Sequence, residues 1–128
     1  EREIDIFTSH FKWLDKVEDS LKSAVSRGVN IRVLMQVDDE DSTKRALKLL
    51  EMGVNVRDCE VWYPTRGTLV DNSKLIYLIW VGDTTRMGRP MIYKPQYTEN
   101  EGLIAVFRDA FENRWLKSRG LERLLGGK

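Results

Sequence analysis

Five polar residues combine the types and positions that a binding or catalytic site requires. Thr8, Ser9 and His10 follow a short apolar run, and His10 is the only histidine of the chain. Arg66 and Asp71 flank a second apolar segment. Guanidinium and carboxylate groups both hydrogen-bond well to phosphates and polyols, so this pair suits a pocket for a small polar ligand. The alternatives are surface charges for Arg66 and Asp71, and a solvated residue near a helix start for His10.

Metal and cofactor chemistry has little support in the sequence. A single histidine excludes a His–His metal pair and a His–His phosphoryl-transfer dyad within one chain. Cys59, the only cysteine, excludes an internal disulfide and a zinc site of paired cysteines. The acidic run 38–41 lacks the glycine and glutamate spacing of an EF-hand loop, and favours the positive N-terminus of a following helix. We therefore expect no metal and no cofactor.

Strands and helices alternate in the first half of the chain. Gly28 and Gly53 each end a predicted helix, because glycine readily adopts the positive φ of a helix C-terminus. Two successive strand–helix–strand units require parallel strands with helices against the sheet, which defines an α/β domain. The predicted elements are a strand at Ile4–Phe7, a helix at Phe11–Arg27, a strand at Val29–Val37, a helix from Asp41 or Ser42 to Met52, and a strand from Val54.

The second half of the chain is richer in β structure. Gly67–Val70 and Lys74–Val81 flank the turn-forming residues 71–73 and predict an antiparallel hairpin. A strand at Met91–Tyr97 and a helix at Asn100–Lys117 complete the order β-α-β-α-β-β-β-β-α. Residues 1–118 form one predicted domain, and residues 119–128 a flexible tail. The predicted apolar face of the closing helix consists of Leu103, Phe107, Ala110, Phe111 and Trp115.

The order of these elements and several short strings resemble one repeat of the phospholipase D fold. Residues 24–34, Ala-Val-Ser-Arg-Gly-Val-Asn-Ile-Arg-Val-Leu, look like the first crossover of that fold, and residues 68–72, Thr-Leu-Val-Asp-Asn, stand where its catalytic strand ends. Residues 106–115 are similar to the closing helix of the phospholipase-D-like domain in archaeal TrmB-type transcriptional regulators. The resemblance implies an α/β domain with a mixed β-sheet, flanking helices and a single repeat.

The catalytic motif of this fold places His, Lys and Asp at relative positions one, three and eight. Counted back from Asp71, the His position holds Pro64 and the Lys position holds Arg66. Proline offers no nucleophile, so the alternative of a phosphodiester-processing enzyme lacks its reacting group. We expect a chain that is not an enzyme.

The resemblance also implies a ligand site. In this topology the first strand and the segment with the degenerate motif end at the same edge of the sheet, so Thr8, Ser9 and His10 are expected to face Arg66 and Asp71. A small polar effector, such as a sugar or a sugar phosphate, would bind there through Arg66, the hydroxyl groups and the helix N-terminus.

The same resemblance implies a homodimer, because phospholipase-D-like domains commonly work as pairs of repeats and this chain has one. The aromatic residues Phe111 and Trp115 are the predicted interface. With 21 Lys and Arg against 20 Asp and Glu, the net charge of +1 does not favour DNA binding by this segment. DNA is expected to contact only a winged helix outside this chain, which opens on Glu1 and suits a fragment.

Three functions follow from these observations. The first is an effector-sensing or dimerisation domain of a transcriptional regulator, the second a phosphodiester-processing enzyme, and the third a purely structural dimerisation domain. A single cysteine, the lack of a signal-peptide pattern and the lack of a long apolar run predict a cytoplasmic location without membrane contact.

Overall fold

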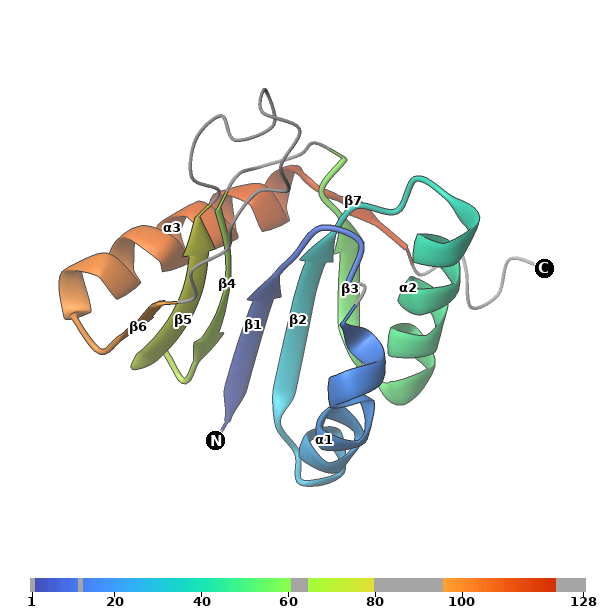
Figure 1. The fold of residues 1–128 in the computed structure, drawn as a ribbon, viewed down its shortest axis with the longest axis horizontal. Helices are drawn as coiled ribbons and strands as arrows, with labels where there is room; N and C mark the ends of the chain where they lie inside the picture. The colour runs from blue at the N-terminus through green and yellow to red at the C-terminus, as the bar shows by residue number, and fades with distance from the viewer. Residues whose placement is uncertain (1, 12, 61–64, 80–95, 122–128) are drawn as a thin grey trace, which may run out of the picture.

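The computed structural model describes residues 2–11, 13–60, 65–79 and 96–121, which form a seven-stranded sheet and three helices. The strand order is β6-β5-β4-β1-β2-β3-β7 (Figure 1). The strands are β1 (Glu3–Phe7), β2 (Asn30–Met35), β3 (Asn55–Asp58), β4 (Thr65–Val70), β5 (Lys74–Ile79), β6 (Gln96–Thr98) and β7 (Arg119–Gly120), and the helices are α1 (Leu14–Ser26), α2 (Glu40–Met52) and α3 (Glu101–Lys117).

Parallel pairing of β1 with β2 and of β2 with β3 confirms the two predicted strand–helix–strand units. Both glycines that were expected to end helices have positive φ, 88° at Gly28 and 100° at Gly53. Helix α1 begins at Leu14, later than predicted, because Phe11 adopts a φ of 56° and buries its ring in the core before the helix starts.

The acidic run 38–41 lies at the N-terminus of α2, as the sequence predicted. Asp39 is the N-cap, and its side chain accepts a hydrogen bond from the backbone nitrogen of Ser42 at 2.7 Å. The hydroxyl of Ser42 in turn receives the backbone N–H of Asp39, which completes a capping box. The cap is therefore Asp39, not Asp41 or Ser42, because only Asp39 stands three residues before a serine that can return the bond.

The predicted hairpin is present as β4 and β5, which pair antiparallel. Its turn contains two non-glycine residues of positive φ, Asp71 at 55° and Asn72 at 57°, the residue types that tolerate this conformation best. Strand β4 also pairs antiparallel with the central strand β1. Strand β6 covers only the last two residues of the predicted 91–97 strand, and residues 91–95 lie outside the described residues.

Two apolar layers cover the sheet. Helices α1 and α2 pack on one face, over a cluster that includes Ile31, Val33 and Val56, and α3 packs on the other, over Leu69 and Leu75 (Figure 1). Among the described residues, each helix is too short or too polar to cross a lipid bilayer.

The buried face of α3 differs from the predicted one at two positions, Leu103 and Ala110. Ile104, Phe107 and Phe111 are buried, whereas Leu103 and Ala110 are exposed. The phase of the helix is set by the two phenylalanines, and Ile104 precedes Phe107 by three residues, which places both on one face. Leu103 lies on the neighbouring, outer side.

The predicted flexible tail is wrong for its first three residues. Arg119 and Gly120 pair antiparallel with β3 as β7, and Leu121 is fully buried in the core beneath α1 and α2. The Arg119 guanidinium also donates to the buried carboxylate of Asp58 at 2.9 Å. Pairing with a distant strand leaves no local sequence signal, and residues 122–128 lie outside the described residues.

Candidate functional site

Thr8, Ser9 and His10 follow β1 at the edge of the sheet where the parallel strands β1 and β2 both end. The pairing of the two strands continues into their loops, because the Thr8 nitrogen donates to the Leu34 carbonyl at 3.0 Å and the Gln36 nitrogen donates to the Ser9 carbonyl at 2.7 Å. The loops after β1 and β2 therefore run next to each other, and they form the polar edge of the sheet.

His10 connects these two loops through both of its ring nitrogens. Its Nδ1 lies 3.1 Å from the Ser9 hydroxyl, and its Nε2 lies 2.8 Å from Oδ1 of Asp38. Ser9 also lies 3.4 Å from the side-chain oxygen of Gln36. Arg45 of α2 donates to the His10 carbonyl at 3.1 Å, which holds the backbone of this loop against α2.

Thr8 has a structural hydrogen bond rather than a free hydroxyl. Its side-chain oxygen accepts the indole N–H of Trp13 at 3.1 Å, and the residue is buried. The hydroxyl thus helps to hold the turn between β1 and α1, and it contributes little to a ligand surface.

Arg66 lies at the same edge as these three residues. Gly67 of β4 pairs with Phe7 of β1, so the next position on each strand brings Arg66 beside Thr8. The Arg66 side chain is half-buried, and its Nη1 is shielded from solvent. The structure thus brings Thr8, Ser9, His10 and Arg66 to one edge, and ligand binding at this edge stays a prediction.

Asp71 lies at the opposite edge, which corrects the expectation that it shares a pocket with Ser9 and His10. Its carboxylate accepts the backbone N–H groups of Arg2 at 2.6 Å and Glu3 at 2.8 Å, at the start of β1. These two backbone bonds lower the pKa of Asp71 below its usual range. Because β4 runs antiparallel to β1, its two ends are at different edges of the sheet, which also excludes a surface pair of Arg66 with Asp71.

Phe111 is not positioned as an interface residue, which corrects a second expectation, whereas an interface role of Trp115 stays a prediction. Phe111 is only 1% exposed and belongs to the core under α3. Trp115 is half-buried and stacks on Phe111 with ring centroids 5.8 Å apart. The aromatic end of α3 faces the protein's own sheet, because the helix needs these rings to cover the strands.

A charged cluster between α3 and the sheet was not predicted from the sequence. Arg32 of β2 donates twice to the buried Asp5 of β1, at 2.9 and 3.1 Å, and also to Glu112 of α3. Its guanidinium lies 4.9 Å from the Phe111 ring centroid and 5.2 Å from that of Trp115. The available signal was a charged residue between apolar neighbours in each strand, Asp5 between Ile4 and Ile6 and Arg32 between Ile31 and Val33.

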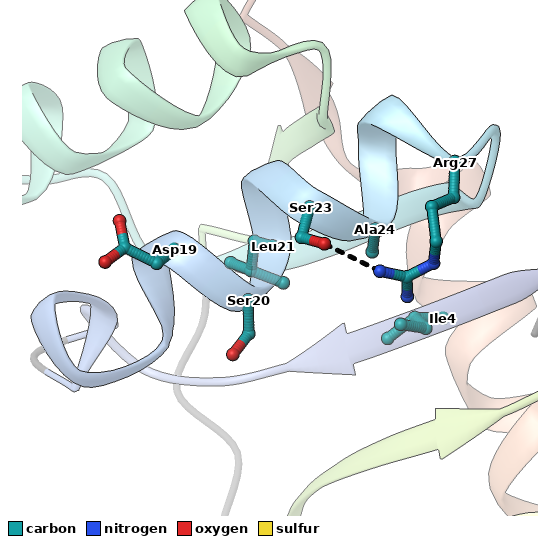
Figure 2. Close-up of a pocket in the computed structure, with 7 residues that line it drawn as sticks. All are labelled: Ile4, Asp19, Ser20, Leu21, Ser23, Ala24 and Arg27. Carbon is teal, nitrogen blue, oxygen red and sulfur yellow. Dashed lines mark hydrogen bonds between the residues drawn. The ribbon is translucent and has the colours of Figure 1, made fainter.

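Among the described residues, a groove, a hollow on the sheet and a cavity of about 430 Å³ beside Arg2, Glu3, Asp71 and Asn72 lie away from the polar edge. A groove of about 490 Å³ separates α1 from β1, with Ile4 on one side and Ser20, Ser23 and Arg27 on the other (Figure 2). Arg27 donates to the Ser23 hydroxyl at 2.7 Å across the helix surface. A smaller hollow of about 210 Å³ lies on the sheet, next to Ile76 and Tyr97.

The sequence matches the profile of a family described as Inactive HKD-Rease over residues 13–101, more than half of the chain. This chain belongs to the Inactive HKD-Rease family. Membership agrees with Pro64 at the position of the nucleophilic histidine, and it confirms the prediction that the chain is not an enzyme. No curated protein sequence matches the chain.

Three solved structures show the same fold as this Inactive HKD-Rease domain. The phospholipase D family member Nuc from Salmonella typhimurium is 15% identical, with a TM-score of 0.72 over 94% of this chain and 82% of Nuc. NucT from Helicobacter pylori is 12% identical, with a TM-score of 0.69 over 94% of this chain and 83% of NucT. These similarities confirm the predicted phospholipase-D-like α/β fold.

The third structure is that of TrmBL2, described as an archaeal chromatin protein with a novel mode of DNA binding. It is 18% identical to this chain, with a TM-score of 0.72 over 94% of this chain and 45% of TrmBL2. The chain therefore spans less than half of the TrmBL2 chain, and at this identity the comparison shows a common fold.

Proposed function

We propose that this chain is a non-catalytic dimerisation domain of a transcriptional regulator whose DNA-binding winged helix lies outside it. The observation that carries the proposal is a sheet face that the helices of the described residues leave open. Helices α1 and α2 cover the half of this face formed by β1, β2, β3 and β7. Strands β4, β5 and β6 extend the sheet beyond the strands that α1 and α2 cover.

The open sheet face consists of Thr68, Ile76 and Tyr97. These residues are direct cross-strand neighbours, Thr68 with Ile76 and Ile76 with Tyr97. Side chains alternate between the two faces of a strand, so they lie opposite to Leu69 and Leu75, which pack under α3. Ile76 is 49% exposed and Tyr97 58% exposed. Adjacent apolar side chains on an open sheet are typical of a protein interface.

A second copy of the chain is the partner that this face fits best. Phospholipase-D-like domains commonly work as pairs of repeats, and a single repeat would leave uncovered the surface that a partner repeat covers. In a twofold dimer the same patch meets itself, so Ile76 and Tyr97 would each contact apolar atoms of the other copy. A domain without catalytic chemistry, similar in fold to the DNA-binding TrmBL2, suits the role of holding two DNA-binding segments together.

Light scattering coupled to size-exclusion chromatography tests the proposal. At tens of micromolar we expect a dimer for the wild-type chain and a monomer for the double variant Ile76→Glu/Tyr97→Glu, because two carboxylates per copy would face each other across the interface. Val106→Glu is the matched control, since Val106 is exposed to a similar degree on α3, over the other face of the sheet.

Two results contradict the proposed dimerisation. A monomeric wild-type chain would refute it outright, and a dimer that survives in the double variant would show that another surface mediates pairing. Circular dichroism of each variant verifies that a monomer is folded.

An effector at the polar edge is the second candidate function, and the position of Arg66 at the same edge as Ser9 and His10 supports it. A sugar phosphate would bind Arg66 through its phosphate group. In a thermal-shift screen of sugars and sugar phosphates, any stabilising compound should lose its effect in Arg66→Ala. An unchanged shift in that variant would exclude Arg66 from the binding site.

A further inference from the structure

The loop after β1 and the loop before α2 bring three metal-ligating side chains together at the polar edge. One ligand atom from each of His10, Asp38 and Asp39 lies within 4.8 Å of the other two. A metal ion bound at 2.0–2.2 Å separates its ligand atoms by roughly 3–3.5 Å, so small side-chain rotations would close this set around one ion. The sequence alone predicts no metal, because the two aspartates are distant from His10 along the chain.

The imidazole of His10 is oriented by its neighbours. Ser9 has one hydroxyl hydrogen, which it donates to the Gln36 oxygen at 3.4 Å. In that arrangement the Ser9 oxygen, 3.1 Å from Nδ1, accepts the Nδ1–H of His10. The ring nitrogen of a metal-binding histidine that does not bind the metal commonly donates its N–H in this way, which fixes the tautomer and the ring orientation.

With the hydrogen on Nδ1, the Nε2 lone pair of His10 points at a carboxylate oxygen of Asp38, 2.8 Å away. Two electron-rich atoms at this distance require a positive centre between them, which is either a proton or a metal ion. Asp39 adds a further carboxylate, whose Oδ1 also accepts the backbone N–H of Ser42 at 2.7 Å and is thereby held at the start of α2.

The charges of the described loop favour a cation. Residues 38–41 are four consecutive acids, and His10 lies against the first of them. Among the described residues, two cations lie near this run: Arg45 donates to the carbonyl of His10 at 3.1 Å, and Lys44 pairs with Glu40 at 3.8 Å. The side chain of His10 is 26% exposed and that of Asp38 is 59% exposed, so an ion can reach the site from solvent.

We propose that His10, Asp38 and Asp39 bind a divalent metal ion of the zinc class. One imidazole nitrogen with two carboxylate oxygens suits Zn²⁺, Co²⁺ or Ni²⁺, whereas Mg²⁺ and Ca²⁺ prefer oxygen ligands alone. Three protein ligands leave at least one position for water. The ion connects the loop after β1 to the start of α2, and so stabilises the polar edge. This proposal is independent of the proposed dimer.

Nuclear magnetic resonance of the tag-free, chelator-treated chain tests the site directly, because His10 is the only histidine and its imidazole signals are unambiguous. Substoichiometric Co²⁺ should shift or broaden these signals, and a Zn²⁺ titration followed by calorimetry should reach saturation at one ion per chain. Asp38→Asn should weaken Zn²⁺ binding by about tenfold or more. Asp41→Asn, in the same acidic run but outside the cluster, should leave it unchanged.

His10→Gln should abolish the one-to-one binding, and thermal unfolding of the metal-free variants verifies that they fold. Imidazole signals that do not respond to Co²⁺ or Zn²⁺ would overturn the proposal. Equal loss of binding in Asp38→Asn and Asp41→Asn would overturn it as well, because it would indicate diffuse attraction to the acidic run.

Discussion

Arg32 shows how a single charged residue can determine the arrangement of buried elements. Asp5 is almost fully buried on β1, where an isolated carboxylate would be strongly unfavourable. Arg32, paired with Asp5 in the strand register, satisfies it with two hydrogen bonds and reaches Glu112 on α3. The same guanidinium lies over Phe111 and Trp115, so it joins the two central strands to the helix above them.

Arg32→Ala should therefore lower the free energy of unfolding by about 3–5 kcal/mol, because it leaves the Asp5 carboxylate buried without its partner. Urea denaturation measures this loss. Adding Asp5→Asn to Arg32→Ala should restore part of it, since the uncompensated charge is then removed. A single variant as stable as the wild type, or no recovery in the double variant, would show that the pair is not important for stability.

At the scale of elements, β7 is the part of the fold that local patterns least predict. It consists of two residues that pair with β3, and the residue after it, Leu121, closes the core under α1 and α2. This pairing means that a domain ending at residue 118 would lack one strand and one core side chain. The glycine-rich composition of the region predicted fraying, but burial of Leu121 favours order.

Leu121→Ala should destabilise the chain by about 2–5 kcal/mol, the usual range for removing a fully buried leucine side chain. Leu116→Ala is the matched control, because the same change at a residue that is 80% exposed should alter stability by at most about 0.5 kcal/mol. Thermal or urea unfolding compares the two variants. Equal effects would mean that Leu121 does not contribute to the core in solution.

At the scale of the whole molecule, the net charge is only +1, and hydrogen bonds stabilise several carboxylates in their ionised form. Hydrogen bonds from Arg32 lower the pKa of Glu112, the backbone N–H of Ser42 lowers the pKa of Asp39, and the backbone N–H of Arg2 lowers the pKa of Asp71. A carboxyl group whose pKa is lower in the folded state contributes stability above its unfolded pKa. That contribution disappears as the pH falls through the folded pKa.

The free energy of unfolding should therefore be nearly constant at neutral pH and decrease as the pH falls below about 4, the ordinary range of carboxyl pKa values. Glu112→Gln should be less stable than the wild type at pH 7 and should show a shallower decrease in acid, because one of the linked protonation steps is removed. Chemical denaturation between pH 7 and pH 3 tests both statements. Identical acid dependence in the two proteins would exclude a contribution from Glu112.

Local sequence signals predicted most of the elements and the absence of phospholipase D chemistry. Gly28 and Gly53 mark helix ends because glycine adopts positive φ without strain, and the period of apolar residues distinguishes strands from helices. Pro64 removes the nucleophile whatever the fold does with its neighbours. These properties depend on one residue or one short segment, so they can be recognised without knowledge of any distant contact.

Only the tertiary structure decided which distant residues meet. The antiparallel pairing of β4 with β1 separates Asp71 from the polar edge and leaves Arg66 there, because reversing a strand exchanges the edges at which its two ends lie. The tertiary structure also buries Phe111 in the core and brings His10 next to Asp38. Such contacts depend on strand register and helix phase across the whole sheet, and these are set by burial of the core rather than by the residues that come together.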